Sequence, residues 1–207
     1  AISMNPYDLD YAADDLKQDK KFILKAMEIE GLSLSGASET LRADKEVVIA
    51  AVTNNGCAIQ FADPSLQGNY EVAKIAISTD PFSLVFAKSL RGDKNFILDA
   101  VKTNGLILNY ASKELQADTE VVFAAVKNNG HALGYASIEN LANHKVVQAA
   151  LLNKDDALKF AYNSISSGYE VRYGYRPGRY LSEKTLTEAF SEFENKKILL
   201  SSYGSLY

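Results

Sequence analysis

The chain has 207 residues, a formal net charge of −4 and 47% hydrophobic residues, a globular composition that suits one sizeable domain or two small ones. Basic residues (22) are slightly outnumbered by acidic ones (26), so the composition disfavours a broad polyanion-binding role, and we expect no nucleic-acid partner. No apolar run approaches the roughly 20 residues that span a bilayer. We therefore expect a soluble protein without membrane insertion.

Cysteine and histidine are scarce in the chain. The single cysteine, Cys57, cannot form an internal disulfide, and two histidines, His131 and His144, are few for a metal cluster. We therefore expect a reducing, cytoplasmic compartment and neither a metal nor a cofactor.

An aspartate or asparagine recurs about every 25 residues, each time directly before a segment with the apolar periodicity of a helix. Side chains of Asp and Asn accept hydrogen bonds from the first N–H groups of a helix, so these residues are typical N-caps. The six positions are Asp19, Asp44, Asn69, Asp93, Asp118 and Asn143. The spacing predicts six long helices in a tandem repeat.

Each long helix carries an alanine seven residues after its cap, where a small side chain lets a neighbouring helix approach closely. These alanines are Ala26, Ala51, Ala76, Ala100, Ala125 and Ala150. A glycine follows twelve residues after the cap in four repeats, at Gly31, Gly56, Gly105 and Gly130. We expect these glycines to end the helices in the left-handed conformation, with positive φ.

A second, shorter helix is predicted after each glycine. Its signature is an aliphatic residue at cap+15, an alanine at cap+18 and, in five of the six repeats, an aromatic residue between them. These aromatic residues are Phe61, Phe86, Tyr110, Tyr135 and Phe160. Serines at 38, 112 and 137 are typical caps of one further helical turn. Because neither helix can bury its apolar face alone, we expect the repeats to stack into an α-solenoid.

In chain order, the sequence predicts a half-repeat at residues 5–18 and then six units that start at Asp19. Residues 1–161 thus form an all-α solenoid of about six 25-residue two-helix repeats. The half-repeat either caps the stack or belongs to a longer array. Residues 162–207 lack the period: a loop or small hairpin at 162–181 is followed by a helix, capped by Ser182, that seals the open end.

The unit DKEVVIAAVTNNGCAIQFA at residues 44–62, with its copies from Asp93 and Asp118, resembles the family catalogued as domain of unknown function 4116. The resemblance covers residues 9–161 and rests on the D-K/T-x-F/V, A-A-V, N-N-G or T-N-G and Y-A-S elements. The repeats from Asn69 and Asn143 depart from it, because they lack Asn-Gly. It implies an all-helical tandem repeat, often in proteins of intracellular bacteria, protist-associated organisms and large viruses. It supplies no catalytic residue.

Candidate catalytic and metal-binding residues have simpler structural interpretations. The sequence lacks phosphate-binding glycine loops and the paired His or Cys motifs of zinc sites. His131 occupies a position that varies among the repeats and is interpreted as a partly covered helix start, and His144 follows a cap as a solvated first-turn residue. Cys57 has no histidine placed beside it by the repeat. We therefore assign no catalytic residue.

The best candidate site is the segment 169–180, where three arginines alternate with tyrosines. Both residue types contribute strongly to binding at interfaces. The predicted partner-binding residues are Arg172, Tyr173, Tyr175, Arg176, Arg179 and Tyr180. Alternatively, the tyrosines cover the end of the stack and the arginines pair with nearby glutamates.

These features favour a non-enzymatic protein–protein interaction module, with a host-directed effector or adaptor role implied by the resemblance. One alternative is an enzyme or phospho-ligand-binding protein that uses Arg172, Arg176 and Arg179 to hold an anion. Another is a structural fragment of a larger multidomain protein. The identity of the partner and the oligomeric state do not follow from the sequence.

Overall fold

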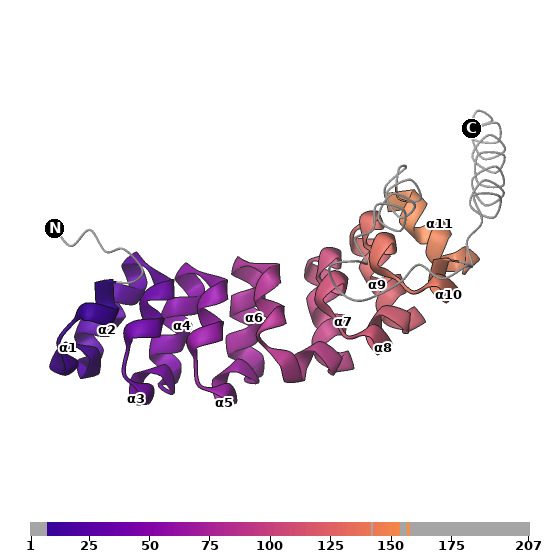
Figure 1. The fold of residues 1–207 in the computed structure, drawn as a ribbon. Coiled ribbons are helices and arrows are strands. Elements are labelled where there is room, and N and C mark those ends of the chain that lie inside the picture. The colour runs from indigo at the N-terminus through magenta and orange to yellow at the C-terminus, as the bar shows by residue number, and fades with distance from the viewer. Residues whose placement is uncertain (1–7, 142, 154–156, 158–207) are drawn as a thin grey trace. The chain divides into compact units, whose positions relative to one another are not determined.

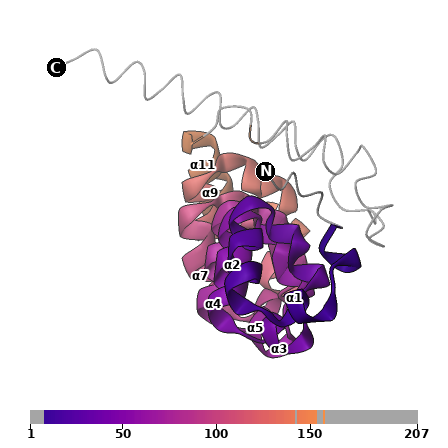
Figure 2. The same cartoon turned by 90° about the vertical axis from the view of Figure 1, so that its left-hand side faces the viewer.

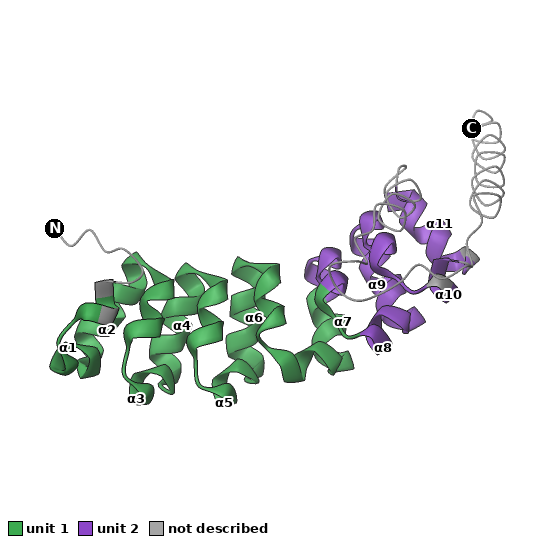
Figure 3. Cartoon of the chain, in the orientation of Figure 1, with its two compact units in different colours: residues 1–100, 110–112 green, residues 101–109, 113–207 purple. Residues whose placement is uncertain are grey.

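A computed structural model describes residues 8–141, 143–153 and 157 (Figure 1). Every regular element in these residues is a helix, and no strand occurs among them. The chain divides into two compact units, the first made of residues 1–100 and 110–112 and the second of residues 101–109 and 113–207 (Figure 3). Within the described residues, no helix is long and apolar enough to cross a membrane.

The helices are of two kinds, α-helices (α) and 3-10 helices (η). Up to the middle of the chain they are η1 (Asp8–Tyr11), α1 (Asp14–Gln18), α2 (Lys20–Ile29), η2 (Gly31–Gly36), α3 (Glu39–Arg42), α4 (Lys45–Asn54), η3 (Gly56–Phe61), α5 (Pro64–Gln67), α6 (Tyr70–Thr79), η4 (Pro81–Val85) and η5 (Lys88–Gly92). They continue with α7 (Lys94–Thr103), η6 (Gly105–Tyr110), α8 (Lys113–Ala117), α9 (Thr119–Asn128), η7 (Gly130–Tyr135), α10 (Ile138–Leu141) and α11 (His144–Asn153).

Each regular repeat is a long α-helix, a 3-10 helix and a short α-helix. The predicted second helix is therefore present, but as a 3-10 helix, the form that proteins use for short helical connections. The predicted further helical turn is present as the short α-helix, for example α3. The predicted cap is absent there, because the Ser38 side chain makes no capping hydrogen bond. η1 and α1 have the same order and occupy the described part of the predicted half-repeat. Residues 158–207, including the predicted C-terminal helix, lie outside the described residues.

All six predicted N-caps are confirmed by hydrogen bonds. Asp19 Oδ1 accepts from the N–H groups of Lys21 and Phe22 at 2.9 and 3.2 Å, which satisfies two donors of the first turn of α2. The same cap is made by Asp44, Asn69, Asp93, Asp118 and Asn143. The start of every long helix is thus fixed by one side chain that the sequence identifies.

In the first compact unit, the long helices α2, α4 and α6 lie side by side in chain order (Figure 1). Seen after a 90° turn, the short helices α1, α3 and α5 lie on the other side from α2 and α4 (Figure 2). The alanines predicted at helix contacts are buried in both compact units: Ala26, Ala51, Ala76, Ala100, Ala125 and Ala150. The assigned contact face is therefore the inward face of the long helices.

The predicted left-handed conformation of the glycines is wrong. None of Gly31, Gly56 and Gly105 has a φ in the left-handed region. In the second repeat the long helix α4 ends at Asn54, and the next residue, Asn55, is extended, with φ of −144° and ψ of 109°. The Asn55 side chain accepts from the Cys57 N–H at 3.1 Å. Each glycine is then the first residue of a 3-10 helix. Pro81, whose ring holds φ near −65°, takes the same place in η4.

Glycine is required by close approach of backbones instead. A Cβ atom on Gly56 would lie 2.3 Å from the Ala76 carbonyl oxygen and 3.0 Å from the Asp80 nitrogen. The same 2.3 Å clash would occur between Gly31 and Ala51 and between Gly105 and Ala125. Because these neighbours are backbone atoms, no side-chain rotation relieves the clash. The 3-10 helix of one repeat therefore lies directly on the long helix of the next.

An asparagine at the end of a long helix forms hydrogen bonds to the preceding repeat beside this contact. Asn54 Nδ2 donates to the Glu28 carbonyl at 3.0 Å, and its Oδ1 accepts from the Gly31 N–H at 2.8 Å. Asn128 bridges Lys102 and Gly105 in the same way, and Asn153 bridges Lys127 and Gly130. Each amide satisfies both a carbonyl at the end of one helix and an N–H at the start of the next.

Main-chain hydrogen bonds also join neighbouring repeats. The Ser38 N–H donates to the Lys17 carbonyl at 3.0 Å, and the Asp63 N–H donates to the Arg42 carbonyl at 2.9 Å. The equivalent N–H of Lys88 bonds within its own repeat, to Phe86. This repeat is one residue shorter than the others, and η5 replaces its short α-helix. The missing residue thus changes the local helix type.

Exposed ion pairs add little to this framework. Lys20 Nζ lies 2.7 Å from Asp44 and 2.8 Å from Glu46, and these hydrogen bonds, Asp44 first, raise the pKa of Lys20. Lys45 Nζ similarly contacts Glu71 at 2.6 Å. Asp44 is partly buried and the other four side chains are exposed, so solvent and salt screen these pairs. Buried apolar contact and backbone approach therefore dominate the packing between repeats.

We predict that Gly56→Ala lowers the free energy of unfolding by about 1–3 kcal/mol, the usual cost of overpacking, because the new Cβ meets the Ala76 carbonyl. Gly92→Ala is the matched control, since the nearest atom to its Cβ would be Ser112 Oγ at 4.0 Å. This control should change stability by no more than about 1 kcal/mol. Urea denaturation measures both. Equal stability of the two variants would contradict the close approach.

We also predict that Asn54→Ala destabilises the protein by about 1 kcal/mol, because two hydrogen bonds between repeats are lost. Thr79 holds the equivalent position on α6 and bonds only to Ile75 of its own helix. Thr79→Ala should therefore stay within about 0.5 kcal/mol of the parent protein. Thermal melting of both variants makes the comparison, and a larger loss for Thr79→Ala would show that the asparagine bridge is unimportant.

Candidate functional site

The predicted Tyr/Arg site lies outside the described residues. This holds for all six of its members, Arg172, Tyr173, Tyr175, Arg176, Arg179 and Tyr180. Its role in binding stays a prediction. The described residues offer other candidates, which lie along the 3-10 helices and the short α-helices.

A long polar side chain stands two residues before each of the first five caps, a pattern that the sequence analysis missed. The five residues are Lys17, Arg42, Gln67, Arg91 and Gln116. Gln67 Nε2 donates to the carbonyls of Gln60 and Ala62, both at 3.0 Å. Arg91 Nε donates to the Tyr110 carbonyl at 2.7 Å. This position therefore supplies donors to the last carbonyls of the 3-10 helices, which have no partner within the helix.

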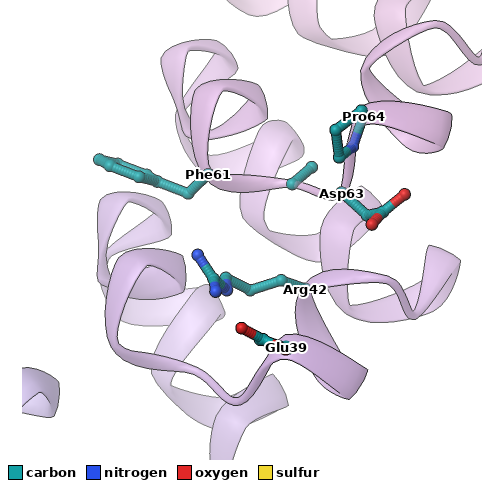
Figure 4. A pocket seen from close by; sticks show the side chains of 6 residues that line it. Glu39, Arg42, Phe61, Asp63 and Pro64 are labelled. Atoms are coloured by element: carbon teal, nitrogen blue, oxygen red, sulfur yellow. The ribbon is translucent and has the colours of Figure 1, made fainter.

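Arg42 differs from its counterparts. Its Nε is buried and has no hydrogen-bond partner. The side chain instead borders a hollow of about 330 Å³ between two neighbouring repeats of the first compact unit (Figure 4). The other residues that line it are Glu39, Phe61, Ala62, Asp63 and Pro64. The hollow joins α3 to the segment between η3 and α5, and its lining is mostly polar.

The charges around this hollow are mixed. Arg42 is the one cation in its lining, and Glu39 and Asp63 bring two carboxylates. Asp63 caps α5, where Ser65 donates to it from its hydroxyl at 2.6 Å and its N–H at 2.9 Å. These bonds hold the pKa of Asp63 below its usual value. Because two carboxylates face one guanidinium, the lining is net negative and disfavours anions.

Aromatic side chains form a second candidate site at the ends of the 3-10 helices. The predicted aromatic position is half-buried at Phe61, Phe86, Tyr110 and Tyr135. In the first compact unit, Phe82 packs edge-to-face on Phe86 and Tyr110, with ring centroids 5.7 and 5.9 Å apart, and is itself 40% exposed. We call Phe82, Phe86 and Tyr110 the aromatic cluster. It presents apolar surface to solvent from one repeat and the next.

Cys57 is poorly suited to nucleophilic chemistry. Its thiol is half-buried and donates to Asp80 Oδ2 at 3.1 Å. Burial, followed by the hydrogen bond and the charge of Asp80, raises the thiol pKa to about 11. Because the thiolate is the nucleophile, this environment suppresses reactivity. Cys57 instead links η3 to the end of α6.

The two histidines lie at the starts of two different helices. His131 is half-buried at the start of η7, where its N–H donates to the Asn129 cap, as its interpretation as a partly covered helix start predicts. His144 begins α11, although its side chain is not among those described. Among the described residues, no three His, Cys, Asp or Glu side chains are grouped to hold a metal ion.

The fold and these sites define an all-helical tandem-repeat protein. The model of one family, described as "Domain of unknown function (DUF4116)", matches residues 1–42, 44–91 and 93–142. The chain belongs to this family, which confirms the resemblance found in the sequence. The second and third matches begin at the caps Asp44 and Asp93, so the family unit contains two 25-residue repeats. Neither a curated protein nor a solved structure matches the chain.

We predict that Asp80→Asn lowers the pKa of the Cys57 thiol, because it removes a negative charge and a carboxylate acceptor that favour the protonated form. The decrease should be partial, since burial is the larger cause. Alkylation rates measured between pH 7 and 11 report the thiolate fraction. Asp63→Asn, which removes a carboxylate that does not contact the thiol, should leave the rate profile unchanged. An unaltered profile in Asp80→Asn would contradict this pairing.

Proposed function

We propose that the chain is a non-enzymatic protein–protein interaction module and that a partner protein docks on the aromatic cluster. The observation that carries this proposal is the 40% exposure of Phe82 within a packed group of three rings. Clustered, exposed aromatic rings provide large contact area with little side-chain entropy to lose, and aromatic residues recur at binding hot spots. Exposed apolar groups of this kind are typical of interaction surfaces.

The high pKa of the Cys57 thiol supports the non-enzymatic part of this proposal. A protein partner is favoured over nucleic acid because the chain is acidic overall, with a net charge of −4. The lone cysteine supports a reducing compartment, and we propose the cytoplasm, either of the producing cell or of a host that receives the protein as an effector or adaptor. The stacked repeats would form a solenoid, and the Tyr/Arg segment at 169–180 would extend its docking surface.

The test uses the full chain to capture partner proteins, followed by calorimetry with the purified partner. We predict that Phe82→Ser weakens binding by about 2 kcal/mol or more, roughly 30-fold, as expected for a hot spot. Phe123→Ser is the matched control, because Phe123 is 38% exposed but lies on the long helix α9. The two rings are about equally exposed, so both substitutions should cost a similar amount of packing, and thermal melting checks that each variant remains folded.

Equal affinity of parent and Phe82→Ser, or an equal loss in Phe123→Ser, would contradict docking on the aromatic cluster. The same assay tests the predicted segment with the double variant Arg176→Ala/Arg179→Ala. Retained affinity in this double variant would remove the segment from the interface.

A further inference from the structure

The hollow beside Arg42 has hydrogen-bonding capacity that the fold does not use. Arg42 Nε is buried without a partner, and the guanidinium extends along the hollow between Glu39 and the segment that carries Phe61 (Figure 4). Nε itself is shielded from solvent, so a ligand in the hollow would meet the guanidinium at its terminal nitrogens, which are hydrogen-bond donors as well. The site therefore favours a ligand that supplies an oxygen atom.

The kind of acceptor is indicated by Arg91. Arg42 and Arg91 hold equivalent positions, because they end consecutive matches to the family, 1–42 and 44–91. Arg91 Nε donates to a main-chain carbonyl, that of Tyr110, at 2.7 Å. The same side chain in the same place of the repeat thus already binds a neutral peptide carbonyl.

The charges around Arg42 exclude a simple anion site. Glu39 and Asp63 outnumber the single guanidinium in the lining, so a phosphate or a free carboxylate meets net repulsion. A lysine or arginine side chain is attracted by the same two carboxylates. The Phe61 ring and Pro64 add apolar contact at the edge of the hollow. A basic, extended peptide satisfies all these groups together.

We propose that this hollow binds an extended peptide segment of a partner protein, which places a main-chain carbonyl on the Arg42 guanidinium and a lysine or arginine side chain between Glu39 and Asp63. This inference rests on the proposed interaction function and names a recognition element for it. The proposed bond has the same chemistry as the one that Arg91 donates to the Tyr110 carbonyl within the fold.

The probe is the capped peptide acetyl-Ala-Lys-Pro-Lys-Ala-amide, in which proline favours an extended residue before it. It is titrated into the full chain while nuclear magnetic resonance follows the Nε–Hε signals of Arg42 and Arg91, assigned through Arg42→Lys and Arg91→Lys. We expect a saturable shift of the Arg42 signal and an unchanged Arg91 signal. Acetyl-Ala-Glu-Pro-Glu-Ala-amide and inorganic phosphate are the controls, and each should bind at least tenfold more weakly.

Two substitutions separate the carbonyl contact from general charge attraction. Arg42→Ala removes a positive charge. If charge alone holds the basic peptide, this variant should bind it more tightly. If the proposed carbonyl contact exists, its loss should weaken binding at least tenfold. Glu39→Gln should weaken the basic peptide several-fold, and Glu28→Gln, on the exposed face of α2, should not. Arg42 Nε makes no hydrogen bond in the fold, so melting should confirm that Arg42→Ala remains folded.

The inference is overturned by any of three results: no shift of the Arg42 signal, an equal or larger shift with phosphate or the glutamate peptide, or unchanged or tighter binding to Arg42→Ala. Its failure is distinguishable from that of the proposed function. If Phe82→Ser weakens the partner while the peptide does not bind, only the Arg42 site is wrong. If the peptide binds at Arg42 while Phe82→Ser leaves the partner unaffected, docking on the aromatic cluster is wrong and this site stands.

Discussion

The contact between one repeat's 3-10 helix and the carbonyl of a buried alanine in the next repeat constrains the rest of the structure. Gly56 leaves no room for any side chain, because even a Cβ atom there would lie 2.3 Å from the Ala76 oxygen. The long helix must also present a small residue at this point, which explains the alanine at cap+7. Backbone-to-backbone packing of this kind is short-ranged and directional. On α6 a one-residue shift would bring Ile75 or Ile77 to the place of Ala76 and force the two repeats apart.

The hydrogen bonds between repeats follow from this approach. Asn54 can span Glu28 and Gly31 only because the two long helices end at the same level. The repeat from Asn69 has Pro81 in the place of the glycine, and proline has no N–H to donate. The next long helix, α7, correspondingly carries Thr103 in the place of the bridging asparagine. At Pro81 the loss of the bridging asparagine therefore leaves no glycine N–H without its acceptor.

Local signals in the sequence were enough to predict the long helices, their caps and their buried alanines, because caps and a 3.6-residue period depend on neighbouring residues only. The glycine conformation was predicted wrongly because its cause is a carbonyl in another repeat. Pro81 was the available signal, since a position that accepts proline cannot require positive φ. Arg42 and its counterparts were detectable as polar residues two places before each cap, but their acceptors come from tertiary packing. The predicted Tyr/Arg site lies outside the described residues and therefore stays a prediction.

Two groups of positions can be distinguished within each repeat: those that join neighbouring repeats and those whose side chains vary at the surface. Glycine, alanine and the bridging asparagines are committed to the contact between repeats, so changing them alters packing before it alters any surface. The positions before each cap and at the ends of the 3-10 helices have more freedom, and there side-chain identity varies, as with Arg42 and Gln67, while the backbone stays similar. Arg91 Nε donates to the Tyr110 carbonyl, whereas Arg42 Nε has no acceptor. One repeating backbone can therefore carry different surface side chains in each repeat without altering the packing that holds the repeats together.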